Sequence, residues 1–255
     1  MNGASYRLSR MTPRPGLDFS DLVALGGLDP YGQHQLVWKF FDLPREPTPT
    51  QVPFLFRAEV RDGLPLLYVL SSDEPRDTSG KWRIESKDYR PALTLGDRLA
   101  FKLRANPTVA RPGDVVLGRD GAPKLRTSGL KTGQPRHRIK RHDVVMDAKQ
   151  RMDWKALPPD ERPSLAHLAY EACAGWLRER EERLGCQFNP ARLRVDGYRT
   201  HRMHRKRGIA LSTVDFEGEL QVTDLERFTP ILFNGIGPAK AFGCGLLLVR
   251  RMTDH

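Results

Sequence analysis

Alternating strand and helix patterns predict an α+β protein with two tandem ferredoxin-like domains, each in the order βαββαβ. The second half of the chain shows the full order, and the first half shows a weaker copy of it. RRM-like RNA-binding modules share this topology with many enzymes, so the fold class does not fix the function. We expect an N-terminal domain over residues 1–107, a basic linker over 108–142 and a C-terminal domain over 143–255.

The first domain begins with a predicted strand near Tyr6–Met11 and continues into a helix. Asp29 can cap the free amides of this helix, and Pro30 suits its first turn because no N–H is needed there. Apolar residues recur at helical spacing until Pro44. The segment 71–91 is polar and rich in turn residues, so a second helix is poorly signalled. Period-two and apolar runs predict strands at Phe54–Arg57, Leu64–Leu70 and Leu99–Leu103.

The second domain has clearer signals, whereas residues 106–143 are rich in Pro, Gly and basic residues and read as a linker with a long loop. Two helices are expected, one capped by Ser164 and ended by Gly185, and one from Leu225 that contains Pro230. The predicted strands are Val144–Met146, one starting at Leu193, Val214–Val222 and Phe242–Arg250.

The composition predicts a polyanionic partner. The 255 residues contain 42 Lys and Arg against 31 Asp and Glu, which gives a formal net charge of +11. Three cysteines without CxxC spacing fit a reducing compartment rather than a disulfide framework or a zinc site. No apolar stretch approaches the roughly 20 residues that span a bilayer, so we expect a cytoplasmic protein with no membrane partner.

A glycine-rich segment before the last predicted strand has the chemistry of a phosphate-binding loop. Glycines allow positive φ and a close approach of backbone amides to a ligand, and Lys240 adds a positive charge. The spacing matches neither a nucleotide P-loop nor a dinucleotide site, which favours a polymeric phosphate ligand. Alternatively, the glycines only turn the chain into its last strand. The four glycines are Gly235, Gly237, Gly243 and Gly245.

Two basic clusters without acidic residues predict contacts with a phosphate backbone, since each such contact adds affinity through counterion release. A solvated charge run is the alternative for either cluster. The strands show no RNP-like pair of aromatics, so we expect recognition of a folded RNA by shape rather than stacking of single-stranded bases. The first cluster contributes Lys131, Arg136, Arg138, Lys140 and Arg141. The second contributes Arg199, Arg202, Arg205, Lys206 and Arg207.

Tyr31 and His34 are the candidate catalytic residues. They lie three residues apart near the start of the first helix, so both project from one face. An imidazole can transfer protons near neutral pH, and a tyrosine hydroxyl can hold a phosphate or the imidazole. A surface or capping histidine is the alternative. No HExxH pair or carboxylate cluster is present, so we expect no metal and no other cofactor.

Several motifs together resemble the CasE family of CRISPR RNA-processing endoribonucleases. They occur in the family's order and reach from the first helix to the last strand. The motifs are Tyr31-Gly32-Gln33-His34-Gln35-Leu36-Val37-Trp38, Phe101-Lys102-Leu103-Arg104-Ala105-Asn106-Pro107, Lys140-Arg141-His142-Asp143, Gly235-Ile236-Gly237-Pro238-Ala239-Lys240 and Gly243-Cys244-Gly245-Leu246-Leu247.

The resemblance implies two ferredoxin-like domains and metal-independent cleavage of CRISPR repeat RNA at the base of its hairpin. In such enzymes the upstream 2′-hydroxyl attacks in line and gives a 2′,3′-cyclic phosphate and a 5′-hydroxyl. His34 matches the family's catalytic histidine and Tyr31 its neighbouring tyrosine. The resemblance also implies retention of the product hairpin and assembly with other subunits of a type I-E Cascade complex.

Two other functions remain open on the sequence alone. In a non-catalytic RNA-binding subunit, Tyr31 and His34 only cap a helix while the basic clusters grip a structured RNA. An enzyme acting on a phosphorylated small molecule is disfavoured, because its site does not need two charged loops. The residues do not show whether His34 acts as general acid or base, nor which cation stabilises the transition state.

Overall fold

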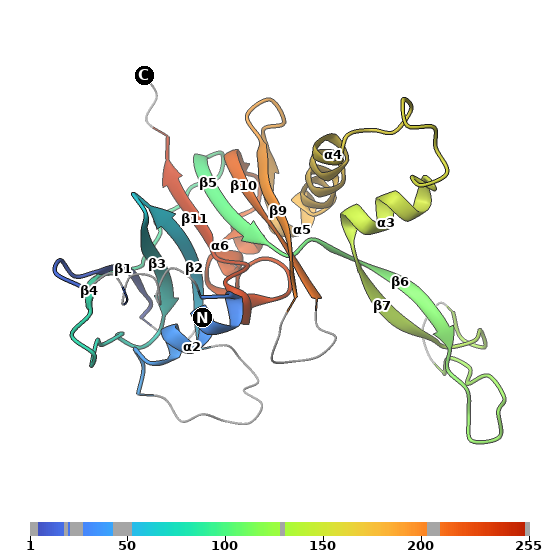
Figure 1. Cartoon of the computed structure of the whole chain (residues 1–255), viewed down its shortest axis with the longest axis horizontal. Coiled ribbons are helices and arrows are strands. Elements are labelled where there is room, and N and C mark those ends of the chain that lie inside the picture. Colours follow the sequence, from blue (N-terminus) through green and yellow to red (C-terminus); the bar gives the residue numbers. More distant parts are fainter. Residues whose placement is uncertain are drawn as a thin grey trace. The chain divides into compact units, whose positions relative to one another are not determined.

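The structure, a computed structural model, describes residues 5–17, 20, 28–42, 53–127, 131–202 and 210–252. The chain divides into two compact units, one formed by Met1–Pro107 with Cys173–His255 and the other by Thr108–Ala172. The first unit contains two antiparallel sheets, and the second contains a two-stranded hairpin that leads into a helix (Figure 1).

The first sheet has the strand order of a ferredoxin-like domain. The order in space is β2-β3-β1-β4, and every neighbouring pair is antiparallel. Helix α2 (Pro30–Trp38) precedes β2, and residues 72–81 between β3 and β4 form no helix. The predicted α+β class is confirmed for this half of the chain, in which α2 lies between β1 and β2 in the sequence. Its strands are β1 (Arg7–Pro13), β2 (Phe54–Arg61), β3 (Leu64–Ser71) and β4 (Trp82–Asp88).

Strand β2 is buried on both faces at its start. Phe54 and Phe56 pack in one core cluster with Val37 of α2. The residue between them, Leu55, packs instead with Leu246, which follows the glycine-rich segment. The alternation of a strand therefore places β2 between α2 on one face and the C-terminal part of the chain on the other.

The second sheet is the second ferredoxin-like arrangement, with the order β11-β5-β10-β8 and with β9 also paired to β10. Trp176 stacks on Phe216 at 6.1 Å between ring centroids, so α4 covers one face of this sheet. The strands are β5 (Arg98–Ala105), β8 (Cys186–Phe188), β9 (Arg194–Arg202), β10 (Ala210–Val222) and β11 (Leu247–Arg251). The helices are α4 (Leu165–Arg178), α5 (Glu181–Leu184), α6 (Leu225–Asn234) and the 3-10 helix η1 (Lys240–Phe242).

Strand β5 corrects the predicted division of the chain. It was expected as a strand of the first domain, but it pairs with β10 and β11 in the second sheet (Figure 1). Leu99, for example, lies opposite Leu220 on one side and Arg251 on the other. These partners are more than 100 residues away in sequence, and period-two alternation carries no information about which strands pair.

The second unit corrects two further predictions. The residues expected to form a linker build the antiparallel hairpin of β6 (Thr108–Val115) and β7 (His137–Asp143). None of its strand residues is buried, so the strands lack the apolar alternation that marks a half-buried strand. The predicted strand Val144–Met146 is instead the start of α3 (Val144–Arg151). An Asp143 side-chain oxygen accepts from the amides of Val145 and Met146 at 2.9 Å, a strong helix start that outweighs strand propensity.

The remaining elements of the second half follow the prediction only in part. The single helix expected between Ser164 and Gly185 is divided into α4 and α5, and strand β8 was not predicted. Helix α6 contains Pro230 as expected, and Gly185 ends α5 in the left-handed conformation with φ of 66°. The final strand begins at Leu247 rather than at Phe242, because Phe242 belongs to η1. The glycine-rich segment from Gly235 to Gly245 therefore ends before the final strand begins.

Ion pairs around the buried Arg57 join the two sheets of the first unit. Arg57 of β2 is 3% exposed and pairs with Glu59 at 2.5 Å and with Asp215 of β10 at 3.1 Å. Arg104 of β5 makes a two-point contact with Asp215 and donates to the Ala58 carbonyl at 2.7 Å. Asp215 is thus the anion shared by two arginines from different sheets.

We expect Asp215→Ala to lower the free energy of unfolding by about 1–3 kcal/mol, because the buried Arg57 loses a carboxylate partner. Glu217→Ala is the matched control: it removes an exposed pair with Lys102 on the same strand, which is worth less than about 1 kcal/mol. Denaturant unfolding of both variants measures the difference. Equal losses would show that the buried network adds no more than a surface pair.

Candidate active site and nucleic-acid interface

Helix α2 presents both candidate catalytic residues. Asp29 caps the helix, since its carboxylate accepts from the Gly32 amide at 2.7 Å, and Pro30 occupies the first turn. Tyr31 and His34 follow within the first two turns, and both are half-buried. The local sequence therefore fixes the start of the helix and with it the face from which the two side chains project.

His34 lies in an aromatic surrounding built by α2 and β2. Its ring centroid lies 5.7 Å from that of Phe54, 6.2 Å from that of Phe56 and 6.0 Å from that of Trp38. The Trp38 indole N–H donates to His34 Nε2 at 2.8 Å. His34 Nδ1 is buried and has no hydrogen-bond partner within the described part of the chain. Burial lowers the pKa of His34, because it penalises the charged imidazolium.

The Tyr31 hydroxyl also accepts a hydrogen bond from a residue one turn later in α2. Gln35 Nε2 donates to Tyr31 Oη at 2.9 Å. Because the oxygen accepts this bond, its own O–H remains able to donate to a ligand. Each candidate catalytic side chain thus accepts a bond from the residue four positions later, and sequence reasoning assigned no role to Gln35 or Trp38. The signal in the sequence that could have found Gln35 and Trp38 is their spacing, since residues four positions apart lie on the same face of a helix.

The glycine-rich segment packs closely against β2. A Cβ at Gly243 would lie 3.1 Å from the Phe56 ring, and one at Gly235 would lie 2.9 Å from the Gly245 carbonyl. All four glycines of the segment have positive φ, between 71° and 96°. Helix η1, which starts at Lys240, contacts both α2 and β2. The segment therefore adjoins the helix and the strand that surround His34.

The amides of this segment correct one expectation. The N–H of Gly235 donates to Ile231 at 2.9 Å, that of Gly245 to Arg104 at 2.7 Å and that of Gly243 to Lys240 at 3.3 Å. These three amides are bonded within the chain and are not free to hold a phosphate. Close packing and positive φ require glycine at these positions whether or not RNA binds, and contacts of Gly235, Gly243 and Gly245 with RNA stay predictions. Gly237 and Lys240 stay predictions as phosphate contacts.

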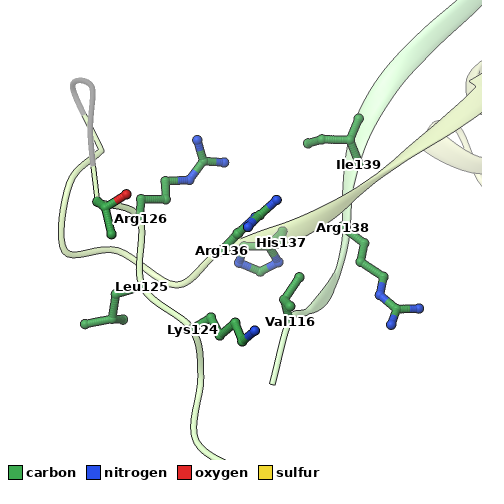
Figure 2. Close-up of a pocket in the computed structure, with 9 residues that line it drawn as sticks. Val116, Lys124, Leu125, Arg126, Arg136, His137, Arg138 and Ile139 are labelled. Atoms are coloured by element: carbon green, nitrogen blue, oxygen red, sulfur yellow. The ribbon is translucent and has the colours of Figure 1, made fainter. Parts of the chain in front are cut away.

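The first basic cluster lines a hollow of about 710 Å³ near the tip of the β6–β7 hairpin (Figure 2). The predicted Arg136 and Arg138 line it together with His137, and no acidic side chain is among the described residues that line it. Backbone bonds around Val116 close the hollow: its N–H donates to the Arg136 carbonyl, and its carbonyl accepts from the Lys124 amide. A concave surface lined by cations is suited to phosphate groups.

Sequence reasoning missed two cations of this hollow, Lys124 and Arg126. They precede the basic cluster and lie among Pro and Gly residues, so only the fold of the hairpin tip brings them to Arg136. The other predicted residues of the cluster lie outside the lining. Lys131 and Arg141 are exposed, and Lys140 pairs with Asp114 at 2.9 Å.

The second basic cluster is only partly described. Arg199 is exposed on β9 and lines a groove of about 550 Å³ with His201 and Thr213. The backbone of Arg202 ends β9. The predicted contacts Arg205, Lys206 and Arg207 lie outside the described residues.

The polar face of the second sheet carries ion pairs between β5 and β10. Lys102 pairs with Glu217 at 2.9 Å, and Arg98 pairs with Glu219 at 3.4 Å. Such a face differs from the aromatic platforms on which RRM domains stack bases. Within the part of the chain that the structure describes, no group of three or more His, Cys, Asp or Glu could hold a metal ion. None of the described helices is long and apolar enough to cross a membrane.

Comparison with known proteins shows to which protein family the chain belongs. The sequence profile of a family described as CRISPR associated protein matches residues 8–251. The chain belongs to this family. The match covers α2, both sheets and the β6–β7 hairpin of this CRISPR associated protein, and the CasE resemblance predicted from its motifs is confirmed.

Two curated relatives and one solved structure are similar over most of the chain. The CRISPR-associated endoribonuclease Cse3 of Thermus thermophilus is 27% identical over 229 residues, covering 87% of this chain and 90% of that relative. The CRISPR system Cascade subunit CasE of Escherichia coli K12 is 29% identical over 225 residues, covering 86% and 90%. The structure of Thermus thermophilus Cse3 bound to an RNA representing a pre-cleavage complex is 25% identical with a TM-score of 0.62, covering 96% and 99%.

Proposed function

We propose that the protein is a metal-independent endoribonuclease that binds and cleaves the hairpin of CRISPR repeat RNA. The main support is α2, which presents Tyr31 and His34 beside η1 in a chain related to an endoribonuclease and to a Cascade subunit. The products carry a 2′,3′-cyclic phosphate and a 5′-hydroxyl. The protein retains the mature guide RNA and assembles with other Cascade subunits in the cytoplasm.

The proposed reaction uses the substrate's own nucleophile. The 2′-hydroxyl upstream of the scissile phosphate attacks phosphorus in line while its proton passes to a base. The bond to the 5′ oxygen breaks, and that oxygen takes up a proton as it leaves. Protons balance without a water molecule, and the protein contributes position, proton transfer and charge.

His34 and Tyr31 have distinct roles in this scheme. His34 transfers a proton at the 2′-hydroxyl or at the leaving 5′ oxygen, since either role needs an imidazole within hydrogen-bond reach. Tyr31 positions the phosphate, because its hydroxyl accepts from Gln35 and can donate its own proton to a phosphate oxygen. Lys240 or an arginine of either basic cluster stabilises the charge of the transition state.

The cationic hollow of the β6–β7 hairpin is the proposed grip on the RNA. Arg136 and Arg138 line it, and three further cations of the cluster are exposed on the same hairpin or its turn. A-form RNA is recognised mainly through its shape, phosphates and 2′-hydroxyls, which suits cations without stacking aromatics. The three further cations are Lys131, Lys140 and Arg141.

One observation favours the alternative, a non-catalytic RNA-binding subunit. His34 Nε2 accepts from Trp38, and the ring is half-buried among aromatics, so neither nitrogen is freely presented to a ligand. In that case the family fold and the basic hairpin serve binding alone.

Two hairpin RNAs of the host's CRISPR repeat distinguish these functions, one all-ribose and one with a single 2′-deoxy ribose at the scissile position. In EDTA, we expect cleavage of the first and binding without cleavage of the second, because only the first carries the nucleophile. Denaturing gels and analysis of the 3′ end measure the outcome. Tight binding without cleavage of either RNA would support the non-catalytic subunit.

A further inference from the structure

The two side-chain hydrogen bonds along α2 have a common polarity. Trp38 donates to His34 at 2.8 Å, and Gln35 donates to Tyr31 at 2.9 Å. An indole N–H can only donate, so His34 Nε2 must offer its lone pair. In a neutral imidazole the proton is then on Nδ1.

We propose that Trp38 is a positioning residue that holds His34, before RNA binds, as a neutral imidazole protonated on Nδ1. The inference rests on the proposed function only in treating His34 as the proton-transfer group. It concerns the state of the ring in the free protein, which is measurable without any cleavage.

The packing around the ring supports a fixed orientation. Phe54 lies 5.7 Å from the His34 ring and 5.4 Å from the Trp38 ring, centroid to centroid, so one side chain of β2 contacts both. The buried Nδ1 has no partner among the described residues, and nothing described there competes with the bond at Nε2. A buried polar atom without a partner is unusual in a native structure and calls for an explanation.

The charged groups near His34 do not offer another explanation for its lowered pKa. On β2, Arg57 and Glu59 pair with each other, and Arg57 also pairs with Asp215. Helix η1 contributes Lys240, and α2 itself contains no acidic or lysine or arginine residue. Burial is the cause of the lowered pKa of His34, and a bond to the neutral ring acts in the same direction.

The contact constrains the chemistry. An imidazolium carries N–H groups on both nitrogens and cannot accept from Trp38. Protonation of His34 at Nε2, whether from solvent or from the 2′-hydroxyl, therefore requires the indole N–H to leave. Trp38 thereby opposes charging of His34 until RNA is bound.

Nitrogen-detected NMR of the histidine side chains in the RNA-free protein tests this state directly. In the wild type we expect Nδ1 to be the protonated nitrogen of His34 at neutral pH. Trp38→Phe keeps an aromatic ring but removes the donor, so the Nε2-protonated tautomer should appear and the titration midpoint should move to higher pH. Trp154→Phe is the matched control, because the Trp154 indole donates to the Pro163 carbonyl and not to a histidine.

The pH profile of cleavage at limiting RNA gives a second readout, because it reports groups of the free enzyme. In Trp38→Phe the limb that His34 controls should move to higher pH, whether His34 is the acid or the base. At a pH on that limb the rate relative to the plateau should change about 2- to 10-fold, the usual net worth of one hydrogen bond.

A second replacement guards against misfolding. A benzothiophene analogue placed at Trp38 keeps the shape of the indole and lacks only the N–H. An unchanged tautomer and an unchanged midpoint in both replacements would overturn the proposal. The proposed function is judged separately by His34→Ala: if that variant cleaves normally, His34 is not the proton-transfer group, while the NMR result still decides the role of Trp38.

Discussion

His34→Ala should lower the single-turnover rate of hairpin cleavage by about 10²–10⁴-fold, the usual contribution of a general acid or base. The affinity for the same hairpin should stay close to that of the wild type, because His34 belongs to neither basic cluster. The ring is half-buried against Phe54 and Phe56, so thermal unfolding must first show that the variant is folded. Gel-resolved cleavage and equilibrium binding then measure the two quantities on one substrate.

His167→Ala is the control for this experiment. His167 is exposed on α4 and is assigned to neither the active site nor the RNA interface, so its replacement should change neither rate nor affinity. A His34→Ala rate within tenfold of the wild type would remove His34 from proton transfer. A parallel loss of affinity and rate would instead indicate that His34 helps to hold the RNA.

The sequence predicted those elements whose signals are local. Asp29 and Pro30 mark the start of α2 because capping depends on the residues at the helix end. The period-two run of β10 is likewise visible because one of its faces is buried. The pairing of β5 with β10 and β11 was not predictable in the same way, since it depends on contacts across more than 100 residues.

The hairpin and α3 show how local signals also mislead. The strands of the β6–β7 hairpin contain no buried residue, so they need no apolar face and their sequence looks like a linker. Val144 and Val145 favour a strand by propensity, yet the Asp143 cap starts a helix there. In both cases the decisive contacts are hydrogen bonds that hydropathy does not report.

The residues of the candidate site could be predicted from the sequence, but the contacts between their side chains could not. Tyr31 and His34 were recognisable from spacing and family motif, whereas the bond from Trp38 to His34 depends on side-chain rotamers. The glycine-rich segment was predicted to offer amides, but Gly235 and Gly245 use theirs within the chain. A glycine pattern alone cannot distinguish close packing from ligand binding.

Neutralising the four cations of the hairpin hollow together should weaken binding of the repeat hairpin by about 10²–10³-fold at 0.15 M salt. This magnitude follows if each cation meets one phosphate and releases its counterion. The slope of log affinity against log salt should fall by about 3–4 at the same time. The four replacements, made in one variant, are Lys124→Gln, Arg126→Gln, Arg136→Gln and Arg138→Gln.

A control of equal charge separates local contacts from net charge. Four cations on the two sheets already lie in ion pairs, so their replacement changes the formal charge by the same amount without emptying the hollow. Binding in this control should weaken far less and keep most of its salt slope. If both variants weaken equally, long-range attraction by the charge of +11 governs binding, and the hollow is not a specific contact. The control replaces Arg10, Arg83, Arg98 and Lys102 by glutamine.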